Sequence, residues 1–112
     1  ELPGWVRRAL EGDVLAPGGG LRGSPAAAHR LPGAPRFATG WVVVRGGSPL
    51  FVYRRGARAS SVDLGPLAPE RLLETGFFRR VDLRTPSGGT TRVFFGVSGP
   101  SEESLRAEFL LG

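Results

Sequence analysis

Residues 77–97 read FFRRVDLRTPSGGTTRVFFGV, and this stretch decides the fold of the chain. Within it, residues 77–84 and 90–97 alternate between apolar and polar side chains, and residues 85–89 are turn formers. A period of two indicates a strand with one buried face, and two such strands around a short turn indicate a β-hairpin. The stretch therefore predicts two antiparallel strands joined by a loop over residues 85–89.

The register of this hairpin follows from its apolar positions, because residues paired across an antiparallel ladder share one face of the sheet. Placing Val81 opposite Val93 gathers most apolar residues on one face, which we expect to be buried. The remaining pairs on that face are Leu83 with Thr91, Arg79 with Phe95, and Phe77 with Val97. The other face pairs Asp82 with Arg92, Arg80 with Phe94, and Phe78 with Gly96. Arg79 belongs to the buried face, so its guanidinium should extend outward or meet a partner.

Length and composition fit one domain with a single core and exclude several kinds of site. The chain has 112 residues and no cysteine, which excludes disulfides, thiolate metal sites and cysteine nucleophiles. No apolar run approaches the roughly 18–20 residues that span a bilayer. The sequence starts without methionine or a signal peptide. We therefore expect it to begin inside a longer product or after processing, with an upstream anchor left open.

The net charge of +5 comes with 15 basic residues, all of them arginine. An excess of positive charge indicates an anionic partner such as nucleic acid or a lipid surface. The chain also lacks Ile, Asn and Met and carries 18 Gly and 10 Pro, a bias that a GC-rich bacterial genome produces without selection for binding. The arginines are spread along the chain with acidic residues between them, so genome composition explains the positive charge better than selection for an anionic partner does. Nucleic acid therefore ranks below other partners.

The first 35 residues are expected to differ from the rest of the chain. Residues 3–12 predict a short amphipathic helix, with Trp5 on its apolar face, that must dock on its own core, a partner or a membrane surface. Residues 13–35 are rich in Gly and Pro without sustained period, which predicts an irregular extended segment with His29 in a solvated loop. Such a long connection favours a segment that binds a partner. The chain thus divides into 1–35 and a β-rich domain, 36–112.

Two further strands are predicted over residues 37–44 and 50–54, joined by a tight turn at Gly46-Gly47. This turn pairs Val43 with Leu50. Both faces of the hairpin are apolar, so it should be covered on both sides.

Three weaker elements complete the chain. Residues 58–64 predict a strand nearer an edge, and residues 69–75 predict a short helix with Glu70 and Glu74 on a solvated face. Residues 101–111 predict a final helix that begins at the N-cap Ser101. Its residues Leu105 and Phe109 should pack on the sheet.

Catalytic chemistry has little support in this sequence. There is one histidine, there is no cysteine, and the acidic residues are mostly single. The neighbouring Glu102 and Glu103 are explained by the start of the last helix. These patterns make neither a triad nor a metal site, so we predict no enzyme, no cofactor and no metal ion.

Arginines and exposed aromatics are the remaining candidates for partner contact. One arginine group lies at the end of the strand 50–54 and the other on the last hairpin. If the two groups adjoin, they form a basic patch interleaved with Tyr53 and Phe94; otherwise they form a solvated face with cross-strand pairs. The candidate contacts are Trp5, Phe37, Arg54, Arg55, Arg58, Arg80, Arg84 and Arg92.

The order of elements from residue 37 is hairpin, strand, short helix, hairpin and terminal helix. With arginine-flanked strands at 79–84 and 92–95 and a closing helix at 101–111, this order resembles the bacterial pleckstrin-homology-like modules. Many of those modules are appended to membrane proteins and usually have seven strands, more than are clear here. The small β-domains of bacterial secretion-system inner-membrane subunits look similar. The expected fold is α+β: a mainly antiparallel sheet or partly open barrel of five or more strands, capped by a C-terminal helix.

The expected function is a non-enzymatic interaction module, an accessory or extrinsic part of a membrane-associated protein complex. The partner is then a protein, and the membrane is reached through that partner or an unseen anchor. The alternative is an arginine-rich binder of nucleic acid or anionic lipid. Salt distinguishes the two, because binding through phosphates weakens log-linearly with salt concentration.

Overall fold

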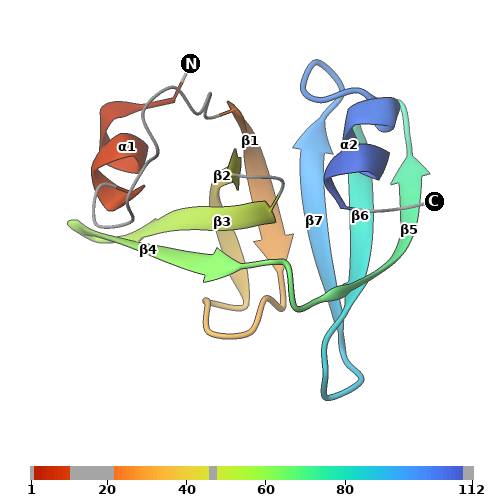
Figure 1. Ribbon diagram of the computed structural model, residues 1–112, viewed down its shortest axis with the longest axis horizontal. Helices are drawn as coiled ribbons and strands as arrows, with labels where there is room; N and C mark the ends of the chain where they lie inside the picture. Colours follow the sequence, from red (N-terminus) through yellow and green to blue (C-terminus); the bar gives the residue numbers. More distant parts are fainter. Residues whose placement is uncertain (1, 11–21, 46–47, 110–112) are drawn as a thin grey trace.

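The computed structural model describes residues 2–10, 22–45 and 48–109, which form one antiparallel sheet and two short helices (Figure 1). The helices are α1 (Gly4–Leu10) and α2 (Glu102–Glu108). The strands are β1 (Arg22–His29), β2 (Phe37–Arg45), β3 (Ser48–Arg55), β4 (Arg58–Asp63), β5 (Ala68–Glu74), β6 (Phe78–Arg84) and β7 (Thr90–Gly96). Among the described residues, the seven strands follow the order β4-β3-β2-β1-β7-β6-β5. The α+β fold is as expected.

The inner face of the curved sheet carries the main core. Alternate residues of five strands meet there and are nearly inaccessible to water, among them Ala28, Val42, Phe51, Val81 and Val93. Leu105 and Phe109 of α2 complete this core, and the Phe109 ring meets the Phe95 ring edge-on at 6.2 Å. The expectation that the last helix packs on the sheet is confirmed, as is its N-cap, because the Ser104 amide donates to the Ser101 hydroxyl. Residues 110–112 lie outside the described part.

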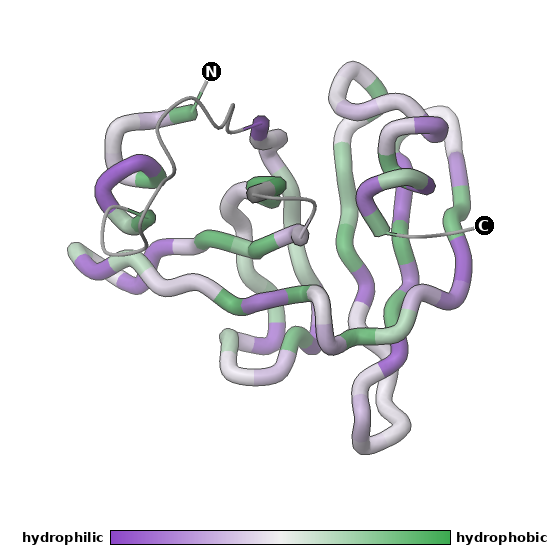
Figure 2. The backbone as a smooth tube through the Cα atoms, viewed as in Figure 1, coloured by the Kyte–Doolittle hydropathy of each residue, from purple (hydrophilic) through white to green (hydrophobic). Residues whose placement is uncertain are grey.

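The helix α1 covers the outer face of β2 and β3. Val6 and Leu10 are fully buried against Val43, Leu50 and Val52, while the charged side of the helix stays in solvent. The alternation of hydrophobic and hydrophilic residues along α1 is visible in Figure 2. The predicted helix therefore exists over Gly4–Leu10 and docks on its own sheet, and the β2–β3 hairpin is covered on both sides as expected. The predicted Gly46-Gly47 turn lies outside the described residues, but the pairing of Val43 with Leu50 is confirmed.

The β6–β7 hairpin has the predicted register. Val81 pairs with Val93, Asp82 with Arg92 and Arg80 with Phe94, and the ladder ends at Phe78 opposite Gly96. Phe77 and Val97 lie just beyond it. Arg79 reaches outward as expected: its Nη1 donates to the carbonyl oxygens of Val97 at 3.1 Å and of Pro100 at 2.9 Å.

The prediction of an irregular segment over residues 13–35 is wrong for residues 22–29, which form β1 in the middle of the sheet. Pro25 and the alanines hid this strand. The β1–β7 ladder starts at Ala26, so Pro25 lies where β1 has β2 alone as a neighbour, and its missing amide hydrogen is tolerated there. Residues 11–21 of the segment lie outside the described part.

The predicted helix over residues 69–75 is also wrong, because these residues form the edge strand β5. Leu72 pairs with Val81 and packs against the core, and Glu74 pairs with Arg79. A register shift between Pro69 and Arg71 accommodates the proline. Pairing with β6 thus overrides the helical tendency of this stretch. The strand β4, which precedes β5 in the sequence and lies at the opposite edge of the sheet, was correctly predicted near an edge.

Glu108, at the end of α2, gives the first prediction. Burial raises the pKa of its carboxyl, an effect only partly offset by the positive charge of Arg22. The folded chain therefore holds this proton more tightly than the unfolded chain, and ionisation of Glu108 lowers stability as pH rises. We expect Glu108→Gln to melt at a higher temperature than the wild type near pH 7, with the difference vanishing near pH 4.

Thermal unfolding at both pH values checks this expectation. Glu103→Gln, on the exposed first turn of the same helix, is the matched control and should give no gain, because a negative charge there favours the helix. Equal melting temperatures of Glu108→Gln and wild type near pH 7 would contradict the prediction.

Candidate functional site

Part of the outer surface of the sheet lies beyond the area that α1 covers. Residues that alternate with the buried positions of β5, β6, β7, β1 and β2 point outward and form two rows across the strands. The first row is Leu73, Arg80, Phe94, Ala27 and Thr39. The second row is Arg71, Asp82, Arg92, His29 and Phe37. We call these ten residues, with Phe78 and Gly96 at one end, the outer face.

The second row contains a carboxylate shared by three arginines. The side chain of Asp82 is almost entirely buried, and its Oδ2 accepts hydrogen bonds from Arg71 Nε at 2.9 Å and Arg80 Nη2 at 3.2 Å. Arg80 Nε lies 2.9 Å from Oδ1, and Arg92 Nε lies 3.9 Å from the same oxygen. The hydrogen bond that Arg71 donates to Asp82, and the negative charge of that carboxylate, raise the pKa of Arg71. Because three cations meet one anion, this cluster keeps a net positive charge.

Other arginines of the hairpin are paired within the sheet. Arg84 Nε donates to Glu70 at 3.0 Å, and Arg79 Nη2 donates to Glu74 at 3.3 Å. The expected solvated pair of glutamates on a helix is therefore replaced by two cross-strand ion pairs. Such pairs at the surface fix the side chains more than they stabilise the fold.

The two arginine groups lie on hairpins that are not neighbours in the sheet, so the condition for a joint basic patch is not met. Arg54, Arg55 and Arg58 lie around the β3–β4 turn, and β2 and β1 separate that hairpin from β7 in the sheet. Tyr53 is buried and donates its hydroxyl to the carbonyl of Gly33 at 3.1 Å, so it is not part of an exposed patch.

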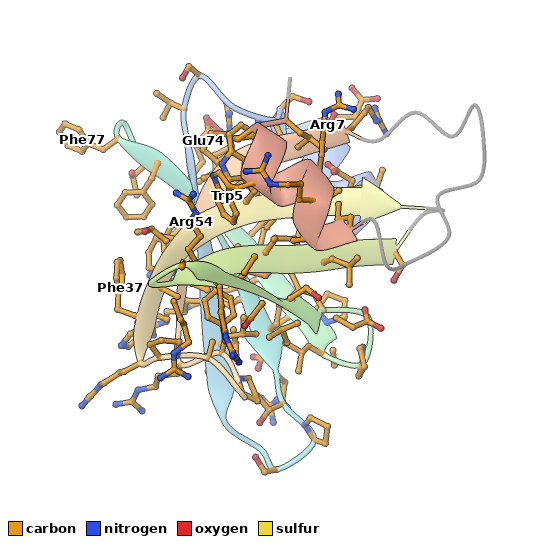
Figure 3. All side chains as sticks on the ribbon, turned by 90° about the vertical axis from the view of Figure 1, so that its left-hand side faces the viewer. Trp5, Arg7, Phe37, Arg54, Glu74 and Phe77 are labelled. Atoms are coloured by element: carbon orange, nitrogen blue, oxygen red, sulfur yellow. The ribbon has the colours of Figure 1, made fainter. Side chains whose placement is uncertain are left out.

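The N-terminal candidate Trp5 belongs to this other side of the molecule. The guanidinium of Arg54 lies 4.9 Å from its ring centroid, and the two side chains lie next to each other in Figure 3. A cation over a ring at this distance is attractive. Trp5 is thus partly buried by its own chain and is separated from the outer face.

A shallow groove of about 400 Å³ runs over the apolar part of the outer face. Its lining includes Pro25, Ala27, Thr39, Phe78, Phe94 and Gly96. The rings of Phe78 and Phe94 meet edge-on at 5.3 Å, and Gly96 leaves open space beside them. The groove is open because the β1 residues that line it, Pro25, Ala26 and Ala27, are small, whereas larger side chains would fill it.

Several large apolar residues are exposed outside the lining of this groove. Among the described residues, the large exposed ones are Phe77 at 87%, Phe37 at 59%, Val97 at 44% and Leu73 at 39%. Phe37 and Leu73 belong to the outer face, and Phe77 and Val97 border its end at Phe78 and Gly96. Figure 3 shows Phe77 and Phe37 projecting from the same side of the molecule. Of these, sequence reasoning identified Phe37 as a contact; Leu73 was missed because residues 69–75, which form β5, were predicted as a helix.

A second hollow of about 420 Å³, here called the basic pocket, lies at the other end of the outer face. It is lined by His29, Arg30, Gly88, Gly89, Thr90 and Arg92. The Arg30 carbonyl accepts a hydrogen bond from Thr91 Oγ1 at 2.9 Å, which ties the end of β1 to β7. His29, expected in a solvated loop, is instead the last residue of β1 and lies beside the Phe37 ring.

In the part of the chain that the structure describes, no three His, Cys, Asp or Glu side chains come together to hold a metal ion. None of the described helices is long and apolar enough to cross a membrane. Comparisons with protein-family models, curated proteins and solved structures find no match to this chain. The outer face, the groove and the basic pocket are therefore the features of the described residues from which a function can be inferred.

Proposed function

We propose that this chain is a non-enzymatic interaction module, an accessory or extrinsic part of a membrane-associated protein complex, and that the outer face binds its protein partner. One observation carries the proposal. Two of the large exposed apolar side chains of the described residues, Phe37 and Leu73, lie on the outer face, and the same face carries a groove lined by Phe78 and Phe94. Contiguous apolar surface of this kind is typical of interaction sites.

The composition of the outer face favours a protein partner. Aromatic residues and arginine are enriched at protein interfaces and dominate their binding energy. Here Phe78 and Phe94 lie beside Arg80, whose guanidinium is already held by Asp82, and Phe37 is exposed on the same face. A side chain fixed before binding loses little conformational freedom on association. Of the two aromatic candidates from the sequence, the proposal therefore rests on Phe37 rather than Trp5.

The resemblance to bacterial pleckstrin-homology-like modules supports the membrane-associated part of the proposal. Those modules usually have seven strands followed by a closing helix, and the described residues of this chain have seven strands followed by α2. Many such modules are appended to membrane proteins, so this chain would reach the membrane through its partner or a further segment.

A second candidate function is binding of anionic lipid or nucleic acid through arginines. Its support is the β3–β4 turn, where Arg54, Arg55 and Arg58 are exposed and have no acidic partner among the described residues. This surface lies away from the outer face, so substitutions separate the two candidates.

The test is purification of the tagged chain from membranes of its source, followed by quantification of co-purifying proteins. We expect Phe37→Ser with Phe94→Ser to reduce a stoichiometric partner by about tenfold or more, because truncated aromatic anchors each cost more than about 1 kcal/mol. Arg55→Ser with Arg58→Ser is the matched control and should retain the partner. Melting temperatures establish that both double variants are folded.

The opposite pattern would replace the first candidate with the second. In that case the partner still co-purifies with the phenylalanine variant and is lost from the arginine variant. Its binding to the wild type also weakens steeply as the salt concentration is raised.

A further inference from the structure

The groove and the basic pocket lie in line along β1 and β7. Ala27 and Phe94 form the row at the groove, His29 and Arg92 form the next row, and Thr90 lies two residues further along β7. Successive outward residues of a strand are about 6.6–6.8 Å apart, so the groove and Thr90 are about 13 Å apart. An extended chain laid along these strands would contact both hollows at once.

The basic pocket has the charge of an anion site. Arg30, Arg92 and His29 contribute to its lining, and no acidic residue does. Arg92 lies 3.9 Å from the shared carboxylate of Asp82, further than Arg71 or Arg80, so its guanidinium retains donors for another acceptor. Gly88 and Gly89 present backbone without side chains, which lets a ligand approach closely.

We propose that the outer face binds an extended, acidic segment of the partner protein. A bulky apolar side chain occupies the groove between Phe94 and Ala27. An Asp or Glu about two to four residues away reaches the basic pocket, where Arg92 binds its carboxylate. This inference rests on the proposed function, to which it adds the chemistry and spacing of the bound segment.

Charge complementarity distinguishes this occupant from others. A basic or neutral segment would leave the arginines at Asp82 and in the pocket without an added anion. A bare phosphate surface would satisfy the pocket but would leave the apolar groove and its exposed aromatic rim in water. A segment that carries both an apolar and an acidic residue matches both hollows.

A random-peptide display selection against the full chain tests the inference. We expect the enriched peptides to share a bulky apolar residue with Asp or Glu two to four positions away. In fluorescence anisotropy, Arg92→Glu should weaken such a peptide about tenfold, because an attractive charge contact becomes repulsive. Arg58→Glu, the same charge reversal at the β4 edge, is the matched control and should bind as the wild type does.

Arg30→Glu provides a second reversal at the basic pocket, should Arg92→Glu lower the melting temperature. Three results would overturn the inference. In the first, the selection enriches no peptide, and in the second it enriches a motif that has no acidic residue. The third result is that Arg92→Glu and Arg30→Glu both leave the binding of an acidic peptide unchanged. Binding to phosphatidylserine vesicles that depends on Arg92, with no peptide enriched, would replace the segment with a lipid surface. If the native partner is lost in the Phe37 and Phe94 double variant but retained by Arg92→Glu, the proposed function stands and this inference fails.

Discussion

Gly40→Ala is expected to lower the free energy of unfolding by about 3 kcal/mol or more, at the high end for overpacking. A Cβ at this position in β2 would clash with the carbonyl oxygen of Val52 and would lie 3.1 Å from the Cα of Tyr53. Both are backbone atoms of the paired strand β3, so relief requires the two strands to move apart. That movement weakens a ladder that both cores share.

Urea unfolding of the purified chain measures this effect. Gly96→Ala in β7 is the control, because an added Cβ there meets open space. We expect its stability to stay within about 1 kcal/mol of the wild type, or to rise slightly, since alanine suits an element interior better than glycine. Equal stability of the two variants would show that β2 and β3 are further apart than described.

Leu105→Asp should lower the free energy of unfolding by several kcal/mol, about 4 or more, because it combines the loss of a buried leucine with the burial of a charge. Leu105 is fully buried and is the residue of α2 most enclosed by the inner core. A domain of this size is typically stable by only about 5–15 kcal/mol, so this variant is expected to be partly unfolded at 37 °C.

The matched control is Ala107→Asp, which places the same charge on an exposed position of the same helix. It should change stability by about 0.5 kcal/mol, mostly through the unfavourable negative charge near the end of the helix. An unchanged melting temperature of Leu105→Asp would mean that α2 is not docked on the sheet.

Local sequence patterns predicted the elements whose partners are close in the chain. The β6–β7 register followed from alternation, and the pairing of Val43 with Leu50 followed from a two-residue turn. The strands β1 and β5 were missed because their local signals favour other structures. β1 is made of small residues and Pro25, and it becomes a strand through β2 and the distant β7. The hydrogen bonds to its two neighbouring strands stabilise β1, because its own residues have little preference for a strand.

The same gap limited the prediction of the site. Phe37, Arg80 and Arg92 were identified as contacts, and the structure brings all three to the outer face. The groove was not predictable, because it exists only where the small residues of β1 lie beside Phe94. Arg84 is paired with Glu70, and the remaining candidates gather on the far side of β2, around Trp5 and the β3–β4 turn.

The central place of β1 has a consequence for biosynthesis. A ribosome releases β1 early, yet its second neighbour, β7, is the last strand to emerge. The strands β1 to β4 can pair as a four-stranded meander while the edge of β1 that pairs with β7 is still unpaired. An unpaired edge is a template for strands of other chains. Closing it joins distant parts of the sequence, which makes this the slow step of folding and the period of greatest aggregation risk.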